Sequence, residues 1–279
     1  MQAVVVVLLC FFAIFSHASL LHVAQTKDAP NVLNFASAVT SATIGGYANG
    51  IALLGTEKLP AHSCRQIAEL RRDVDNGVYH IKSVVTGDSF PVFCDMANGG
   101  YTMVYKAVSG VSGNVANVWT KTGVSNEEQV NALNTNNFFK GHYKNRIVDE
   151  WRSYRPKEVV VVLYKGGAEV VRMVFDGHLS RKNSWFTKQR LAFSPYTDLK
   201  TSSTNYFGIQ GHKTREWFIN KNYGGCGKDA GWLVFYSPGL GCSWEPKTKI
   251  QIKYSRTNKA QNWSNGNVGE ADAMAVFVD

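Results

Sequence analysis

Short catalytic motifs are absent from this sequence of 279 residues. There is no G-x-S-x-G nucleophile elbow, no H-E-x-x-H zinc motif, no Walker loop, and no G-x-G-x-x-G after an apolar strand pattern. The sequence therefore predicts a protein that is not an enzyme, although a catalytic group assembled only by the fold leaves no such motif.

Low-complexity tracts and repeats at solenoid spacing are also absent. Hydrophobic residues make up 44% of the chain and aromatic residues 12%, which is sufficient for a packed core. The length fits one large domain or two small ones.

No charged residue interrupts the apolar run from Ala3 to Phe15. This run is too short to cross a membrane, which takes about 20 residues. Small residues follow at Ser16 and Ala18, and this order is typical of a secretory signal peptide. We expect residues 1–18 to be cleaved as a signal peptide, leaving a secreted, extracellular protein without a transmembrane segment.

Only five cysteines are present, and Cys10 lies within the expected signal peptide. The other four form two near pairs, separated by 30 and 16 positions. No C-x-x-C pair is present and the histidines are scattered, which argues against a zinc site. In an oxidising compartment the spacing predicts two local disulfides, Cys64–Cys94 and Cys226–Cys242.

Charge is distributed unevenly along the chain. The formal net charge is +9, and residues 181–259 alone contain 14 Lys and Arg against four Asp and Glu. This surplus favours an anionic partner, such as an acidic glycan, an acidic matrix polymer or a membrane surface. The alternative is that these cations only solvate loops. An exported protein rarely meets nucleic acid, so we expect no nucleic-acid partner.

Residues 19–59 lack cysteine and are rich in Ala, Ser, Thr and Gly. Gly45-Gly46 and Gly50 weaken any long helix in this segment. It is a pro-segment, a linker, or an oligomerisation segment that brings protomers together in a homo-oligomer, and the pattern leaves these alternatives open. Residues 60–279 are expected to form the main domain.

From Cys64 onward, short β-prone runs are separated by Gly, Asn and Asp. Besides the hairpin described next, these runs predict strands at 77–82, 90–94, 101–106, 206–210, 217–220, 232–236, 249–254 and 273–278. Residues 127–139 predict a helix that is capped by Ser125-Asn126. Trp217, Trp232 and Trp244 lie beside or within strand patterns, which favours core positions for them.

The strongest hairpin pattern covers residues 159–175, where Gly166-Gly167 joins two valine-rich runs. The unbroken run from Val159 to Val162 predicts a central strand buried on both faces. We expect the last run, 273–278, to be tied into a central sheet. The sequence predicts the α+β class: a twisted, mostly antiparallel sheet with few short helices, long loops and two local disulfides.

Four motifs surround the first cysteine pair. They are Ser63-Cys64-Arg65-Gln66-Ile67, Asn76-Gly77-Val78-Tyr79-His80-Ile81, Phe90-Pro91-Val92-Phe93-Cys94-Asp95-Met96 and Gly99-Gly100-Tyr101-Thr102. In order, spacing and residue type they resemble the opening of a fibrinogen-like domain, with Tyr101 where that family usually has Trp. The resemblance implies that residues 60–279 form a fibrinogen-like domain that binds glycans or matrix and catalyses no reaction.

The C-terminal third departs from the vertebrate pattern of that family. The motifs there include Asn222-Tyr223-Gly224-Gly225-Cys226, Gly231-Trp232, Cys242-Ser243-Trp244-Glu245 and the ending from Gly269 to Val278. They are similar to skeletal organic matrix proteins of corals, which carry a fibrinogen-like domain, and distantly to intelectins, which are calcium-dependent lectins. In this family the second disulfide closes a loop beside the ligand and calcium region, so the resemblance implies calcium as a cofactor. Asn220 and Asn222 replace the aspartates of calcium-binding members.

Trp263 lies in a loop of Asn, Ser and Gly that precedes the final strand. This setting predicts an exposed ring that stacks on a sugar, with the Asn265 amide fixing hydroxyls. Asn262-Trp263-Ser264 is also a glycosylation sequon, and a glycan on Asn262 would crowd the ring. An inert loop is the third alternative.

Asn222, Tyr223 and Asp229 lie in a glycine-rich segment that Cys226 ties down. We predict that they form the rim of a ligand pocket. The alternative is a turn region held together by a disulfide for stability alone.

Calcium needs several oxygen ligands and benefits from negative charge. Asp229, Glu270 and Asp272 are the carboxylates that best suit this role, because the last two lie near the Trp263 loop. Their position just before a strand equally suits plain solvent-facing residues.

The sequence leaves two functions open. One is a secreted, lectin-like recognition protein that binds glycans, acidic ones included, through its C-terminal loops. The other is a structural protein of an extracellular or skeletal organic matrix without a defined small ligand. Glycans or acidic extracellular matrix polymers are the expected partners in both cases.

Overall fold

The computed structural model describes residues 50–238, 241–245 and 248–279. The chain divides into two compact units, Met1–Ala52 and Leu53–Asp279. The fold described below is that of the second unit, which begins within the predicted N-terminal segment.

The predicted signal peptide, Cys10 and residues 19–49 lie outside the described residues, so cleavage and the role of that segment stay predictions. Among the residues that are described, no helix combines the length and the apolar character needed to cross a bilayer.

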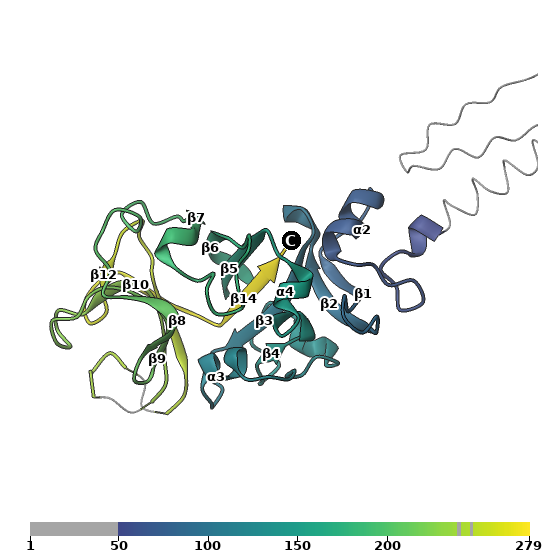
Figure 1. The fold of residues 1–279 in the computed structure, drawn as a ribbon. Coiled ribbons are helices and arrows are strands. Elements are labelled where there is room, and N and C mark those ends of the chain that lie inside the picture. Colours follow the sequence, from purple (N-terminus) through teal and green to yellow (C-terminus); the bar gives the residue numbers. More distant parts are fainter. Residues whose placement is uncertain (1–49, 239–240, 246–247) are drawn as a thin grey trace, which may run out of the picture. The chain divides into compact units, whose positions relative to one another are not determined.

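Two antiparallel sheets organise the second unit (Figure 1). The first has the order β1-β2-β3-β14-β5-β6-β7, with β4 paired to β3, and the second has the order β13-β11-β10-β9-β8, with β12 paired to β10. The first sheet contains β1 (Gly77–Lys82), β2 (Ser89–Asp95), β3 (Tyr101–Val108), β4 (Tyr143–Lys144), β5 (Glu158–Lys165), β6 (Ala168–Asp176), β7 (Leu191–Phe193) and β14 (Ala273–Val278). The second contains β8 (Tyr206–His212), β9 (Arg215–Asn222), β10 (Ala230–Tyr236), β11 (Gln251–Ser255), β12 (Gln261–Asn262) and β13 (Val268–Ala271).

Helices in the described residues are few and short. They include α2 (Cys64–Leu70), α3 (Val115–Thr120), α4 (Trp151–Tyr154) and the 3-10 turns η1 (Met96–Asn98), η2 (Val130–Leu133), η3 (Arg146–Val148) and η4 (Lys188–Arg190). Together with the antiparallel strand pairs, they confirm the predicted α+β class.

The centre of the first sheet is the predicted valine hairpin and the final strand. Gly166 and Gly167 have φ angles of 60° and 81°, which form the tight turn between β5 and β6. β14 lies between β3 and β5, where Val276 pairs with Val161 of β5 (Figure 1). The side chains of β5 enter apolar clusters on both faces of the sheet, so the prediction of a doubly buried central strand is confirmed.

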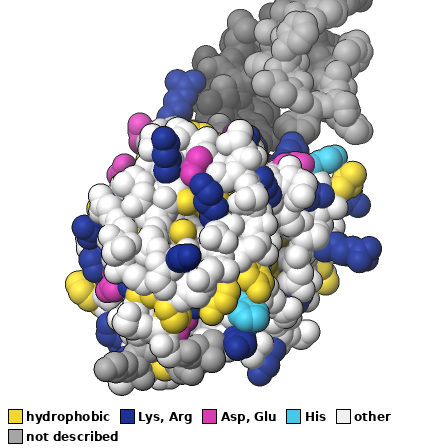
Figure 2. Space-filling model, turned by 90° about the vertical axis from the view of Figure 1, so that its left-hand side faces the viewer, with side chains coloured by type: hydrophobic (Ala, Val, Ile, Leu, Met, Phe, Trp, Pro, Cys, Tyr) yellow, Lys and Arg dark blue, Asp and Glu magenta, His cyan; other side chains and the backbone are white. Residues whose placement is uncertain are grey.

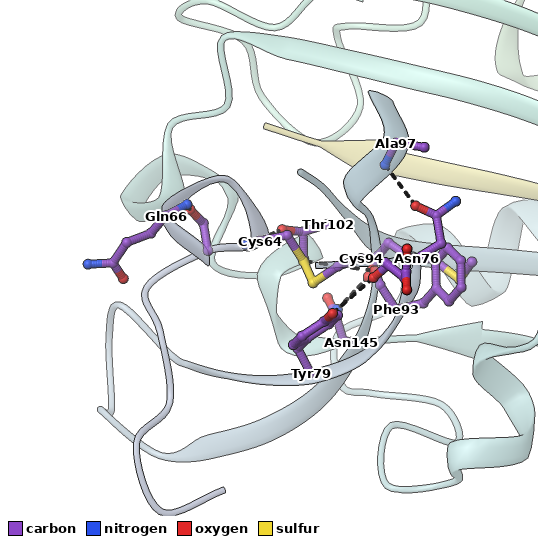
Figure 3. The surroundings of a disulfide bond; sticks show 12 residues. Cys64, Gln66, Asn76, Tyr79, Phe93, Cys94, Ala97, Thr102 and Asn145 are labelled. Atoms are coloured by element: carbon purple, nitrogen blue, oxygen red, sulfur yellow. Dashed lines mark hydrogen bonds between the residues drawn. A yellow bond between two sulfur atoms is a disulfide. The ribbon is translucent and has the colours of Figure 1, made fainter. Parts of the chain in front are cut away.

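The first disulfide joins α2 to β2, as the cysteine spacing predicted (Figure 3). The Cα atoms of Cys64 and Cys94 are 5.5 Å apart, and the backbone N–H of Cys64 donates to Thr102 Oγ1 in β3. Gly100 has a φ of 82°, and a Cβ there would lie 2.7 Å from the Cys64 carbonyl oxygen. The second glycine of the Gly-Gly-Tyr-Thr motif is therefore required by the close approach of α2.

The helix predicted at residues 127–139 is wrong, because only η2 forms there. Asn126 has a φ of 52° and provides no helix cap. Glu127 is buried and forms a bidentate ion pair with Arg146, with a shortest distance of 2.6 Å between Oε2 and Nη2. A long-range ion pair, rather than helical periodicity, fixes this segment.

An aromatic cluster fills the space between the two sheets. Its fully buried members include Trp119, Trp185 and Trp217, and the ring of Trp119 lies 5.4 Å from both Tyr105 and Trp217. The predicted core positions of Trp217, Trp232 and Trp244 are confirmed by their burial.

His142 is buried against β3, where its Nδ1 accepts the backbone N–H of Val108 at 3.1 Å. Burial, together with the positive charge of Lys106, lowers the pKa of this imidazole to about 4. In the unfolded chain His142 therefore becomes protonated below pH 6.5, whereas in the folded chain it becomes protonated only near pH 4. The contribution of neutral His142 to the free energy of unfolding is fully present above pH 6.5. It is lost progressively as the pH falls from 6.5 through about 4, by about 3 kcal/mol in total.

We expect His142→Gln to flatten this acid dependence, because an amide oxygen accepts the Val108 N–H without titrating. Urea unfolding at a series of pH values between 7 and 4 measures the slope. The exposed His178→Gln is the matched control and should keep the wild-type slope. A wild-type slope in His142→Gln would contradict the assignment.

Candidate functional site

The outer face of the second sheet carries a separate cluster beneath the predicted ligand loops. Its buried members are Phe218, Val234, Tyr236, Cys242, Trp244 and Trp263. The second predicted disulfide is present, with the Cα atoms of Cys226 and Cys242 5.3 Å apart. The predicted ligand loops therefore rest on a packed base.

A buried network of charges lies inside this base. Arg215 of β9 donates from Nη1 to Asp229 Oδ2 at 2.6 Å and from Nε to Glu245 Oε1 at 2.9 Å. All three residues are less than 10% exposed. The second oxygen of Glu245 accepts the backbone N–H of Cys242, so the network also holds the disulfide loop.

Asp229 is the centre of this network rather than a rim residue. Its Oδ1 accepts from Asn220 Nδ2 at 2.9 Å, and it is fully buried. Burial raises the pKa of the Asp229 carboxyl, while the Asn220 hydrogen bond and the charge of Arg215 oppose that rise. Both oxygens are already used, so a pocket-rim position for Asp229 is wrong.

The prediction of an exposed Trp263 ring is also wrong. The residue is 1% exposed, its Nε1 donates to Asn220 Oδ1 at 3.0 Å, and its ring lies 6.1 Å from that of Trp244. Gly231 lies directly beneath it, because a Cβ at Gly231 would come within 2.7 Å of the Trp263 ring. The ring has no accessible face on which a sugar could stack, although the Asn- and Gly-rich sequence around it suggested one.

Two loops close over Trp263 by hydrogen bonds between them. Asn262 Nδ2 donates to the Gly227 carbonyl at 2.9 Å, and Ser264 Oγ donates to the Cys226 carbonyl at 2.7 Å. The sequon amide is thus already engaged in a contact within the protein. Glycosylation of Asn262 stays a prediction.

Of the predicted ligand residues, Asn222, Tyr223 and Asn265 are exposed. Tyr223 is 49% exposed, and the Arg215 guanidinium lies 5.2 Å from the centre of its ring. The same guanidinium also lies 4.7 Å from the centre of the Trp244 ring. The buried Arg215 therefore contacts the half-exposed Tyr223 ring, and the exposed Asn222 precedes that ring in the sequence.

The carboxylates predicted for calcium do not gather. Within the described parts of the chain, no group of three or more His, Cys, Asp or Glu is placed to hold a metal ion. Asp229 is taken up by Arg215, Glu270 is exposed on β13, and Asp272 accepts from Lys165 Nζ and Gly166 N–H at 2.7 Å each. Partial burial raises the pKa of Asp272, but the Gly166 hydrogen bond and Lys165 outweigh it and hold that pKa below its usual value. Calcium binding stays untested.

Sequence reasoning missed Arg215. The only available signal was a charged pair, Arg215-Glu216, directly before the apolar run Trp217-Phe218-Ile219. Alternation along β9 places Arg215 on the outer face and Glu216 toward α3, where its Oε2 accepts the Ala116 N–H at 2.8 Å. The pairing partners of Arg215 are 14 and 30 positions away, which no local pattern reveals.

The basic surplus of residues 181–259 is not gathered into one patch on the face that carries the second sheet. Figure 2 shows Lys and Arg side chains scattered over that face, with hydrophobic side chains in a band below its middle. Two of the cations, Arg215 and Lys253, are buried. The charge therefore provides dispersed contacts rather than one concentrated anion site on this face.

An open pocket of about 360 Å³ lies on different elements, at α3 and the residues that follow it. It is lined by Asn114, Asn117, Val118, Lys121, Thr122, Gly123, Val124 and Ser125. None of the predicted ligand residues contributes to it.

Comparison with solved structures finds the fibrinogen-like globe domain of human ANGPTL6, at 13% identity and a TM-score of 0.40, covering 78% of this chain and 95% of that one. The corresponding domain of human ANGPTL2 has 13% identity and a TM-score of 0.37, covering 79% and 99%. Lamprey fibrin D-dimer, complexed with the peptide Gly-His-Arg-Pro-amide, has 12% identity and a TM-score of 0.32, covering 58% and 51%.

Two of these three structures are fibrinogen-like globe domains. Neither the comparison with family models nor that with curated proteins gives a match.

Proposed function

We propose that this chain is a secreted, fibrinogen-like recognition protein that binds glycans at the rim formed by Asn222, Tyr223 and Asn265. The observation that carries the proposal is the half-exposed Tyr223 ring held over the buried Arg215 guanidinium. Lectin sites combine such an aromatic face with a few fixed polar groups. The two disulfides suit an oxidising, extracellular setting.

The rim is rigid before any ligand arrives, which favours binding because little conformational entropy is lost. The Cys226–Cys242 disulfide, the Arg215 network and the hydrogen bonds between the two loops all fix the backbone below it. Asn222 and Asn265 are exposed, so their amides are free to meet sugar hydroxyls.

The test is retention of the secreted protein on an array of neutral and sulfated glycans, with and without calcium. Tyr223→Ala should weaken retention about tenfold, the effect of losing roughly 1.4 kcal/mol of stacking. Phe193→Ala, which removes a similarly exposed ring on β7, is the control and should bind as wild type. Wild-type retention in Tyr223→Ala, or no retention on any glycan, would overturn the proposal.

The dispersed cations favour a second candidate, a structural protein of an extracellular or skeletal organic matrix, as the coral resemblance suggests. Many weak contacts with an acidic polymer would be screened by salt. Binding to heparin that is multi-site, falls steeply between 50 and 500 mM NaCl and ignores Tyr223→Ala would favour this function. Saturable binding of one small sugar would count against it.

A further inference from the structure

The two sheets end in four terminal strands, β1, β7, β13 and β8. The edge of β1 is covered, because His80 N–H donates to the Gly55 carbonyl and Lys82 N–H to the Ala61 carbonyl, each at 2.8 Å. β7 has only three residues, and β13 has four, one of which is the exposed Glu270. Short, charged or covered edges are how proteins prevent unwanted strand pairing.

β8 is longer, uncharged and uncovered, and its pairing with β9 has one register shift, between Gln210 and His212. It has seven residues, Tyr-Phe-Gly-Ile-Gln-Gly-His, and contains no proline, lysine, arginine or carboxylate. On one side it pairs with β9. Among the described residues, no backbone or side-chain hydrogen bond reaches its other side. Tyr206 to Gly208 and Gly211 to His212 are partly exposed, and Gln210 is exposed, so this edge is accessible.

The strand is held rigidly from both faces. Tyr206 stacks on Phe218 at 5.2 Å and lies 5.4 Å from the His212 ring on the outer face. Phe207 contacts Phe186 at 5.4 Å on the inner face. A fixed strand with free N–H and C=O groups is a template to which an extended peptide can add.

The charges around β8 indicate which peptide charge would suit this edge. The exposed Lys213 follows the strand directly. Lys221, whose side chain is 43% exposed, follows Asn220, the partner of Tyr206, and its Nζ lies 4.0 Å from Asp198 Oδ2. The carboxylates of Glu216, Asp229 and Glu245 are all buried. Asp198, the remaining acid of residues 181–259, accepts from the Trp232 indole and the Ala260 N–H. Cations therefore flank a neutral strand of seven residues.

We propose that the free edge of β8 docks an extended peptide segment of a partner protein, with a neutral centre and acidic residues toward its ends. The peptide would continue the second sheet as a sixth main strand, with backbone hydrogen bonds giving affinity and Lys213 and Lys221 selecting the charge. A second copy of this chain is a poorer occupant, because a net charge of +9 repels itself. This site is independent of the glycan rim.

The experiment uses an array of heptapeptides with alternating Val and Thr centres and acidic, neutral or basic ends, probed with the secreted protein. Peptides with acidic ends should be retained. N-methylation of the backbone nitrogens on one edge of the peptide should weaken binding at least about tenfold, because strand addition needs those N–H groups. Hydrogen exchange should slow at Tyr206–His212 when the acidic peptide is bound.

Lys213→Glu with Lys221→Glu should also weaken binding at least about tenfold, because both flanking charges are reversed. Lys58→Glu with Lys157→Glu changes the net charge equally at exposed positions elsewhere and should leave binding intact.

Equal loss in both double variants, insensitivity to N-methylation, or no preference for acidic ends would overturn the proposal. Concentration-dependent dimerisation with protection of β8 would overturn it in favour of a second copy. Wild-type peptide binding by Tyr223→Ala would separate this site from the glycan rim.

Discussion

Replacing Arg215 with methionine should lower the free energy of unfolding by about 3–5 kcal/mol, the usual cost of leaving buried charges without their partner. Arg215 is 4% exposed and donates to both Asp229 and Glu245, at 2.6 and 2.9 Å. Because methionine fills much of the same volume, the loss of stability comes from the unpaired carboxylates rather than from a cavity. Urea unfolding of the oxidised protein at pH 7 measures it.

Arg256→Met is the matched control, because Arg256 is exposed directly after β11 of the same sheet, and it should change stability by less than about 0.5 kcal/mol. Combining Arg215→Met with Asp229→Asn and Glu245→Gln should recover part of the loss, since the buried negative charges are then gone. A loss below about 1 kcal/mol in Arg215→Met would show that the carboxylates do not depend on this cation.

Removing residues 273–279 should prevent folding altogether. These residues form β14 and Asp279, and β14 lies between β3 and β5 in the middle of the first sheet (Figure 1). Met274, Val276, Phe277 and Val278 are fully buried, and at about 1.5–3 kcal/mol each their burial is comparable to the whole stability of a domain, about 5–15 kcal/mol. Secretion yield and protease resistance of the truncated chain measure the effect.

Asp279→Ala provides the comparison for that truncation. It keeps β14 but removes the acceptor of the Lys157 and Glu158 N–H groups, at 2.8 and 2.9 Å. We expect a folded, secreted protein that has lost about 1–3 kcal/mol. Normal secretion and protease resistance of the chain ending at Asp272 would refute the central role of β14.

Local patterns predicted much of the first sheet. Strand β1 forms at 77–82, as its short β-prone run predicted, and the valine hairpin turns at Gly166-Gly167. Both disulfides link the cysteine pairs that spacing alone selected. These features succeed because turns, strand runs and short disulfide loops depend on residues that are near one another in the sequence.

The errors arose where distant residues compete with local preference. Residues 127–139 had a helical pattern, but Glu127 pairs with Arg146 and the segment is held by that contact. Trp263 stands among Asn and Gly, yet Gly231 leaves room beneath its ring and Asn220 accepts its indole N–H. Neither partner is visible from the residues next to Trp263.

The sequence by itself determined the elements that depend on neighbouring residues: the antiparallel strands, the Gly-Gly hairpin, the two disulfide loops and a buried final strand. Only the tertiary structure decided which polar residues are exposed. It buries Asp229 against Arg215, places Trp263 in the core and leaves Tyr223 at the surface. The physical reason is that burial of a charge or a ring depends on partners brought together from distant strands, whereas a turn or a strand depends mainly on its own residues.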